Sequence, residues 1–237
     1  MSPKETIFTC DAVLGAALEV VRRHGWNGLT ARSLAARLGA SVAPVYSAFG
    51  SMKNLQRETI REIRRLLREC TSQTYTDIPF LNIGVGIVSF ARDEPALFQT
   101  LFHTRHGFQD IVEDVNASIL TWMKTDAQLS LLADASRERL YDNIGFYTMG
   151  LASAIAAGRV SDVSKDNIVR LLMNMGNIVT FAEVSGIADC ESPENEREWA
   201  RILAGKNIPL PGGKSPRAQR KPSTGRARPR KARKKNA

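Results

Sequence analysis

Residues 29–55 read LTARSLAARLGASVAPVYSAFGSMKNL, and this stretch decides the fold because it predicts two short helices joined by one tight turn. Thr30 is a favourable N-cap for the first helix, and Leu29 before it can pack against Leu34 as a hydrophobic staple. Gly39 stands where a helix end needs a residue in the left-handed conformation. We therefore expect the first helix to end at Gly39.

The second helix of this stretch is short, because Ser41 can cap its start and Phe49-Gly50 ends it about two turns later. A short capped helix that crosses another through a glycine turn is typical of the helix-turn-helix, whose second helix enters the DNA major groove. The sequence thus predicts a DNA-binding head of three helices over residues 1–50.

An ordered set of motifs surrounds this stretch. In chain order, they are His24-Gly25-Trp26, Gly28-Leu29-Thr30, Leu34-Ala35, Leu38-Gly39, Val45-Tyr46, Phe49 and Leu55. With this spacing, residues 7–60 resemble the TetR family of bacterial transcriptional regulators, and residues 90–98 and 150–152 are similar to more loosely shared segments of its C-terminal domain. The resemblance implies an all-α protein that joins a helix-turn-helix head to a C-terminal helical ligand-binding and dimerisation domain.

Two positions of the head depart from the TetR pattern. Members usually carry a lysine two residues after the position of Gly50, where this chain has Met52 followed by Lys53. They also often carry an aromatic residue or a histidine at the position of Ala48. Lys53 is therefore the candidate for the phosphate contact at the start of the fourth helix.

Apolar residues recur at helical spacing along the rest of the chain, and no run alternates apolar and polar residues as a strand would. We expect helices from about Ile7 to His24, over 51–73 as a connecting helix, and at about 80–92, 95–104, 108–126, 137–157, 164–186 and 194–204. The predicted regions are the head at 1–50, a helical regulatory and dimerisation domain at 51–205, and a disordered basic tail at 206–237.

The formal charge of +9 is unevenly spread over the 237 residues. Residues 1–70 carry 11 Lys or Arg against 6 Asp or Glu, residues 71–205 carry 10 against 18, and residues 206–237 carry 12 against none. A basic head and tail around an acidic middle indicate nucleic-acid contact at the ends only, and they exclude a uniformly basic coat.

The tail combines Pro, Gly and basic residues with one apolar cluster, Ile208-Pro209-Leu210. It cannot bury enough surface to offset its chain entropy, so we expect it to be disordered. It is either an electrostatic arm on DNA phosphates, which we favour, or a solvated extension without a role.

The second short helix lacks the Arg, Lys, Asn and Gln side chains that make bidentate contacts with bases. Base recognition would then rest on small apolar contacts with thymine methyl groups, on Ser47 and on Arg32 of the preceding helix, with DNA shape contributing to specificity. Val45 is expected to face the core, whereas Tyr46 is either core or, as the TetR resemblance implies, a phosphate contact. The predicted DNA-binding residues are Thr30, Arg32, Ser41, Val42, Ala43, Pro44, Tyr46, Ser47 and Lys53.

Two apolar stripes at helical spacing lie in the 137–157 and 164–186 helices. They are either the core of one chain or, as the resemblance implies, part of a four-helix interface with a second copy, which suits a two-fold operator. The candidate interface residues are Leu151, Ile155, Leu172, Met175 and Val179. Four glycines of this region are costly in a helix, and close packing would explain them; they are Gly145, Gly150, Gly158 and Gly176.

The aromatic and methionine residues of the middle region form either ordinary core or the wall of a pocket. The TetR resemblance implies an effector pocket between these helices, and its composition would suit a small hydrophobic molecule. The candidate ligand-binding residues are Phe102, Trp122, Phe146 and Tyr147.

Two histidines offer the main alternative chemistry. His103 and His106 could share one helical face with Asp110 and Glu113, although Gly107 is expected to break that helix. A metal site needs three or four convergent ligands, so a metal-dependent enzyme is the weakest of the functions considered.

Known catalytic patterns are absent from the sequence, including H-E-x-x-H, G-x-S-x-G and a glycine-rich phosphate loop. We therefore expect no enzymatic activity, no metal and no cofactor. Cys10, Cys70 and Cys190 are scattered, which favours reduced cysteines in a cytoplasm. No apolar run reaches the length of a membrane helix, so no membrane partner is expected.

The sequence as a whole predicts a cytoplasmic, homodimeric regulator of TetR type that binds a palindromic operator in double-stranded DNA. The expected mechanism is repression that a small hydrophobic effector relieves. The alternative is a ligand-independent architectural DNA-binding protein, in which the basic tail dominates binding and the middle domain only dimerises. Strong preference for one palindrome would distinguish the regulator from the architectural protein.

Overall fold

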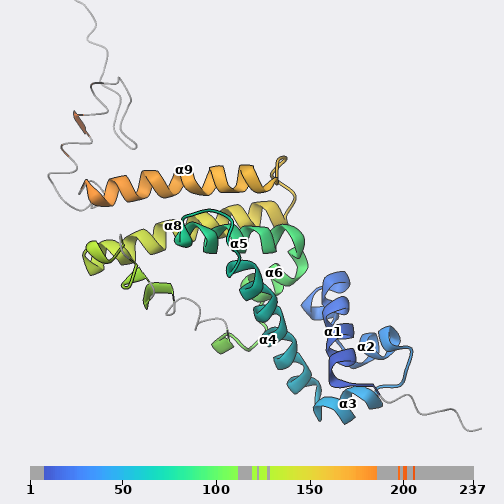
Figure 1. The fold of residues 1–237 in the computed structure, drawn as a ribbon. Coiled ribbons are helices and arrows are strands. Elements are labelled where there is room, and N and C mark those ends of the chain that lie inside the picture. Colours follow the sequence, from blue (N-terminus) through green and yellow to red (C-terminus); the bar gives the residue numbers. More distant parts are fainter. Residues whose placement is uncertain are drawn as a thin grey trace, which may run out of the picture. The chain divides into compact units, whose positions relative to one another are not determined.

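The computed structural model describes residues 8–111, 119–121, 123–126 and 129–185, together with 197, 200, 201 and 205. The chain divides into two compact units, Met1–Ala188 and Asp189–Ala237, and the first contains every helix named below. All regular elements of the described residues are helical, which confirms the all-α fold (Figure 1). Among them, no helix combines the length and the apolar character that crossing a membrane requires. The tail at 206–237 lies outside the described residues, and the predicted boundaries at 50 and 205 stay predictions.

Three helices form the head. They are α1 (Cys10–His24), α2 (Ala31–Leu38) and α3 (Ala43–Phe49), with a 3₁₀ turn, η1 (Trp26–Gly28), after α1. The buried residues Val13, Ala17 and Val21 recur every four positions, so α1 presents one apolar face. Both α2 and α3 contact α1, which makes it the centre of the head.

The start and end of α2 are as the sequence predicts. The Thr30 hydroxyl accepts a hydrogen bond from the Ser33 amide at 3.1 Å, and the Ser33 hydroxyl accepts one from the Thr30 amide at 3.0 Å. Gly39 has φ +61° and ψ +32°, the left-handed conformation that closes a helix end. Leu29 and Leu34 are both buried, as the expected staple requires.

The start of α3 differs from the prediction by one residue. The N-cap position is Val42, and the Ser41 hydroxyl instead accepts a weak hydrogen bond from the Ala43 amide at 3.3 Å. Pro44 lies in the first turn, where its missing N–H leaves no helical hydrogen bond unmade. The helix therefore begins two residues after Ser41.

The connecting helix and the body follow the head. They comprise α4 (Met52–Thr71), α5 (Pro79–Asp93), α6 (Pro95–His103), η2 (Leu129–Leu131), α8 (Asp134–Ala156) and α9 (Lys165–Val184). Ser51 caps α4 as predicted, since its hydroxyl accepts a hydrogen bond from the Asn54 amide at 3.1 Å. Helix α5 contacts α4, α6, α8 and α9, and Figure 1 shows α8 and α9 side by side. Helix α5 is thus the centre of the body.

Two of the expected helices are only partly within the described residues. As predicted, the helix does not continue from His103 to Asp110, but α6 already ends at His103, and Gly107, with φ +80°, lies in the loop that follows. Residues 112–118 of the expected 108–126 helix, and most of the expected 194–204 helix, lie outside the described residues. Helix α8 begins at Asp134, three residues earlier than expected at 137.

The close helix crossing of the body is at Gly86, not at the glycines that the sequence suggested. A Cβ atom built on Gly86 would lie 2.6 Å from the Cys70 carbonyl oxygen and 2.6 Å from the Thr71 Cα. Helix α5 therefore crosses the last turn of α4 with backbone against backbone.

Close packing within this chain does not explain the other glycines that the sequence suggested. Gly158 has a different explanation, because it forms a turn. An added Cβ would meet nothing within 4 Å at Gly145, Gly150 or Gly176. Gly158 has φ +67° just after α8, a conformation that favours glycine.

We expect Gly86→Ala to lower the free energy of unfolding by about 1–3 kcal/mol, because the new methyl group overlaps backbone atoms that cannot rotate away. Gly150→Ala is the matched control, since it adds a methyl group to a helix where nothing lies within 4 Å. We expect that control to stabilise the protein by up to about 1 kcal/mol. Urea denaturation followed by circular dichroism measures both changes, and equal midpoints for Gly86→Ala and the unaltered protein would contradict the crossing.

Candidate nucleic-acid interface and ligand cavity

One face of helix α3 is buried in the core and another face is exposed to solvent. Val45 is completely buried, as predicted, and anchors α3 in the core of the head. Its neighbour Tyr46 is 49% exposed and Val42 is 42% exposed. Tyr46 is therefore not a core residue, and its phenolic group lies on the open face of the head.

Most of the other predicted DNA-binding residues are exposed. Exposed side chains are those of Thr30, Arg32, Ser41, Ala43, Ser47 and Lys53, while Pro44 is half-buried. The Ser47 hydroxyl donates a hydrogen bond to the Pro44 carbonyl at 3.2 Å, which leaves its oxygen able to accept one from a base. Their contact with DNA stays a prediction.

The start of α4 explains one departure from the TetR pattern. Met52 is half-buried and packs against the core of the head, so it cannot act as a polar contact. Lys53 is exposed in the first turn of α4. Its ammonium group and the helix N-terminus together would favour a phosphate at this point.

The head is fastened to the body by charged and aromatic contacts. Both guanidinium nitrogens Nε and Nη2 of Arg22 in α1 donate to the Glu94 carboxylate before α6, each at 2.8 Å. The paired hydrogen bonds raise the pKa of Arg22. Trp26 of η1 meets the His106 ring edge to face, with 5.9 Å between ring centroids. The helix α6 and the loop after it therefore contact the head directly.

The two histidines and Asp110, which the sequence suggested as possible metal ligands, each contact a different residue. His103 Nε2 lies 3.0 Å from the Ser153 hydroxyl, and His106 Nδ1 accepts the Phe108 amide at 3.1 Å. Burial lowers the pKa of His106, which favours its neutral form. Asp110 pairs with Arg57 at 3.4 Å, and Glu113 lies outside the described residues. Across the described part of the chain, no group of three or more His, Cys, Asp or Glu could hold a metal ion.

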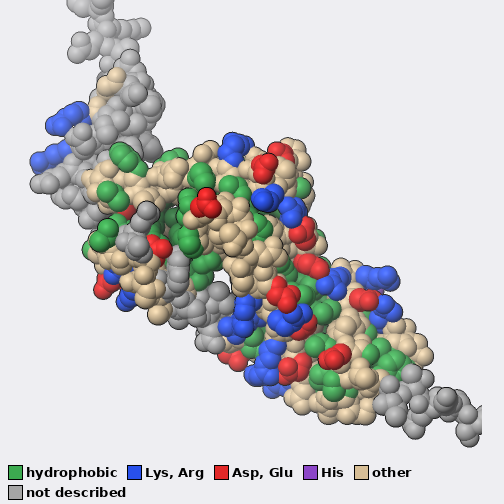
Figure 2. Space-filling view, viewed as in Figure 1, with side chains coloured by type: hydrophobic (Ala, Val, Ile, Leu, Met, Phe, Trp, Pro, Cys, Tyr) green, Lys and Arg blue, Asp and Glu red, His purple; other side chains and the backbone are tan. Residues whose placement is uncertain are grey.

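A large cavity of about 1270 Å³ opens between α4, α5, α8 and α9. Its walls are mainly apolar, with Leu67, Ile83, Ile87, Leu140, Met149 and Leu172 among the lining residues. Figure 2 shows hydrophobic side chains in the hollow beside α4 and α8. The composition fits a hydrophobic ligand, and the volume exceeds that of a typical drug-sized pocket.

Only one of the predicted ligand-binding residues lines this cavity among the residues that the structure describes. Phe102 lines it, and Trp122 lies outside the described residues. Phe146 and Tyr147 are not among its lining residues, and Phe146 is 77% exposed, so this side chain points to the surface. Sequence periodicity could not separate Phe146 from the cavity, because α8 has apolar residues on more than one face.

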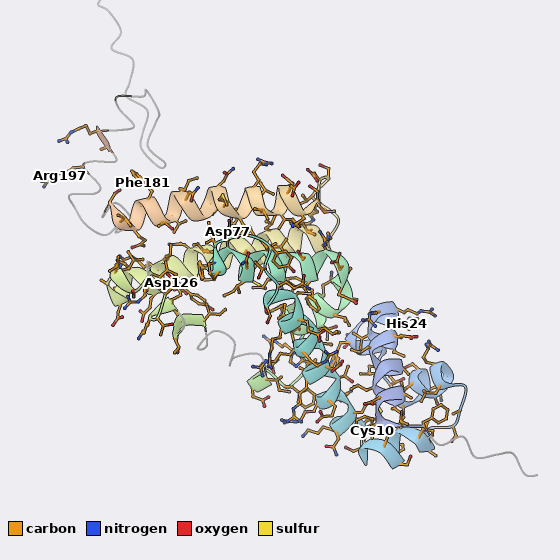
Figure 3. All side chains as sticks on the ribbon, viewed as in Figure 1. Cys10, His24, Asp77, Asp126, Phe181 and Arg197 are labelled. Atoms are coloured by element: carbon orange, nitrogen blue, oxygen red, sulfur yellow. The ribbon has the colours of Figure 1, made fainter. Side chains whose placement is uncertain are left out.

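Sequence reasoning missed the polar and glycine positions of the cavity. Gly84, Gly145 and Gly176 line it, and glycines inside three long helices were the available signal. Charged residues also contribute, and Figure 3 labels two of them, Asp77 and Asp126. The lining also includes Tyr141, whose pKa is raised by burial.

The predicted dimer residues are only partly available at the surface. Ile155 and Leu172 are 6% and 4% exposed and belong to the core of the single chain, which corrects their assignment. Leu151, Met175 and Val179 are half-buried. The strongly exposed apolar side chains of α8 and α9 are Phe146, Ile178, Phe181 and Val184, with exposures of 77%, 64%, 68% and 70%. Figure 3 places Phe181 near the C-terminal end of α9.

Comparison with known proteins agrees with this geometry. Residues 13–59 match the family described as bacterial regulatory proteins, tetR family. A TetR-like transcriptional regulator from Rhodococcus sp. RHA1 is 17% identical, with 73% of this chain and 94% of that chain covered and a TM-score of 0.54. A TetR family protein from Vibrio parahaemolyticus is 17% identical, with coverages of 70% and 96% and a TM-score of 0.50. No curated protein matches the chain in sequence.

Proposed function

Because the chain belongs to the TetR family of bacterial regulatory proteins, we propose that it is a homodimeric repressor which a small hydrophobic effector releases from a palindromic operator. The observation that carries the proposal is the head, in which buried Val45 holds α3 while Val42, Ala43, Tyr46 and Ser47 are exposed. A short helix presented in this way is the part of a helix-turn-helix that enters the major groove.

The exposed face of α3 suits recognition by shape and by small apolar contacts. Val42 and Ala43 offer methyl groups to thymine, and the Ser47 oxygen can accept a hydrogen bond from a base. Arg32 of α2 and Lys53 of α4 flank this face with positive charge for the phosphates. We propose that these groups position the head, and that DNA deformability adds specificity.

The operator test is selection of DNA ligands from a random pool by the full-length protein. We expect a two-fold symmetric sequence whose half-sites lie about one helical turn, roughly 34 Å, apart. Binding without sequence preference would contradict the proposal and favour an architectural DNA-binding protein instead.

Tyr46→Phe tests the phosphate contact. Removal of one exposed hydroxyl should weaken operator binding by about threefold to tenfold, because the variant cannot donate this hydrogen bond, and should leave the melting temperature unchanged. Fluorescence anisotropy at fixed salt measures the affinity. Tyr75→Phe is the matched control, because the Tyr75 hydroxyl donates to the Cys70 carbonyl at 3.0 Å inside the body. That control should lower stability and spare DNA affinity, whereas equal affinities for Tyr46→Phe and the unaltered protein would remove Tyr46 from the interface.

Four strongly exposed apolar side chains of α8 and α9, those of Phe146, Ile178, Phe181 and Val184, support the homodimer, and Phe181 and Val184 also line the cavity. Exposed aromatic and aliphatic side chains grouped on one surface mark interaction sites in soluble proteins. An isologous contact through these side chains would pair two copies with two-fold symmetry, which is the symmetry of a palindromic operator. We propose that α8 and α9 of two chains meet there.

Effector release is proposed to act through the helices that both line the cavity and touch the head. Leu67 of α4 and Phe102 of α6 contribute to the cavity walls. Helix α4 begins directly after the head, and the loop after α6 carries His106 to Trp26. A ligand that binds one arrangement of α4 and α6 more tightly would shift the population of head positions and so the affinity for the operator. A DNA regulator of this kind acts in the cytoplasm.

A further inference from the structure

The cavity contains one buried hydroxyl that the fold itself does not use. We propose that Thr148 is the polar anchor of the effector, and that the effector is an uncharged, mainly apolar molecule with one oxygen that hydrogen-bonds to this hydroxyl. The inference rests on the proposed function, because it defines what the regulatory cavity takes.

Thr148 is 3% exposed and lines the cavity from α8. Its Oγ1 atom is buried and has no hydrogen-bond partner. A buried hydroxyl without a partner is costly, and native proteins retain few of them. A ligand in the cavity would supply the missing partner.

Other buried threonines in helices do make a hydrogen bond through their hydroxyl groups, so Thr148 is an exception. Thr59 and Thr100 each donate a hydrogen bond to the backbone carbonyl four residues earlier, at 2.8 Å. This local bond is the usual solution for a threonine inside a helix. Thr148 does not make it, although α8 provides the same carbonyl geometry. Among the buried polar residues of the described chain, Thr148 is also the one that lines the cavity.

The hydroxyl oxygen is itself buried, so a ligand oxygen would reach it through a small shift of the side chains beside it. A Cβ atom built on Gly84 of α5 would lie 3.6 Å from Thr148 Oγ1 and 3.5 Å from Leu172 Cδ1. The absence of a side chain at Gly84 therefore leaves space beside the hydroxyl, on a residue that itself lines the cavity. Leu172, which is buried beside the hydroxyl, makes its immediate surroundings apolar and would disfavour a charged ligand group there, while Arg64, Arg68, Asp77 and Asp126 also line the cavity.

Three variants isolate the hydroxyl. Thr148→Val removes it and preserves the shape of the side chain, whereas Thr148→Ser keeps it and removes the methyl group. Gly84→Ala leaves Thr148 intact and covers its oxygen with a methyl group at ordinary contact distance. If the hydroxyl has no structural role, Thr148→Val should melt at the same or a higher temperature without ligand, because an unsatisfied polar group has gone.

The probes share one skeleton and differ in one substituent: naphthalene, 2-naphthol and 2-naphthoate. Displacement of the neutral dye N-phenyl-1-naphthylamine from the full-length protein measures their affinities. We expect 2-naphthol to bind the unaltered protein about threefold to tenfold more tightly than naphthalene, which corresponds to one hydrogen bond. This ratio should fall to about one in Thr148→Val and Gly84→Ala and persist in Thr148→Ser.

Several results would overturn the proposal. One is an unchanged ratio in Thr148→Val, and another is a lower melting temperature of that variant with the ratio retained, which would make the hydroxyl structural. Tightest binding of 2-naphthoate would assign the cavity to anions, and no binding of any probe would exclude this ligand class. Operator affinity measured on the same preparations keeps the two questions apart, because selective operator binding would survive each of these failures.

Discussion

Replacement of both Ile178 and Phe181 by aspartate is expected to convert the protein into monomers and to weaken operator binding by about a hundredfold or more. Both side chains are more than 60% exposed on α9, so the substitutions should not disturb the core of the single chain, although Phe181 also lines the cavity and operator binding is therefore measured without ligand. Two aspartates from each copy would place like charges in an apolar contact, which would separate the copies. A monomer loses the effective-concentration gain of linked half-sites, which is typically a factor of about 10²–10⁴.

Sedimentation velocity gives the oligomeric state, and anisotropy with operator DNA gives the affinity. Leu131→Asp is the matched control, because Leu131 is 85% exposed but lies in η2 and not on α8 or α9. That control should remain dimeric and bind normally. A double variant that sediments as a dimer at micromolar concentration would show that the interface lies elsewhere.

Deletion of residues 206–237 is expected to lower the slope of log affinity against log salt concentration by about 3 to 4 units, at roughly 0.9 unit for each phosphate that the tail neutralises. The segment carries 12 basic residues and no acidic ones, and this change corresponds to about a third of them touching DNA. The preference for operator over random DNA should change much less, since phosphates carry little sequence information. The melting temperature should hardly change.

Titrations of the full-length and shortened proteins at several salt concentrations measure this slope. A full-length variant with its 12 basic tail residues changed to glutamine separates charge from length. It should match the deletion. An unchanged salt slope in both proteins would identify the tail as a solvated extension, while loss of the dimer on deletion would indicate that the tail packs on the body.

The head could be predicted in detail because its determinants are local. Thr30 and Ser33 cap one helix through neighbours three residues apart, Gly39 closes it, and Ser51 starts α4. Each of these signals depends on a side chain and a backbone group a few positions away, so the linear sequence contains the whole interaction. The exception at α3 is equally local, since Pro44 and Val42 shift the cap by one residue.

The cavity and the dimer surface were harder to predict because periodicity identifies an apolar face without identifying what covers it. Phe146 and Leu172 both belong to apolar stripes, yet Phe146 is on the surface and Leu172 is in the core. The Gly86 crossing depends on Cys70 and Thr71 of another helix, which no local pattern reveals. Thr148 similarly becomes a candidate binding residue only once the structure shows that its hydroxyl has no hydrogen-bond partner.

The backbone crossing at Gly86 also determines where α4 can turn. Cys70 and Thr71 are held against α5 at the C-terminal end of the helix, while Met52 at the other end adjoins the head. At about 1.5 Å per residue, the distance from Cys70 to Met52 is about 27 Å. If α4 tilts about this crossing as a straight rod, a tilt of about 5° would displace its head end by about 2 Å over this length. A ligand beside Leu67 would need to move the helix only slightly, close to the crossing, to change the separation of two recognition helices in a dimer.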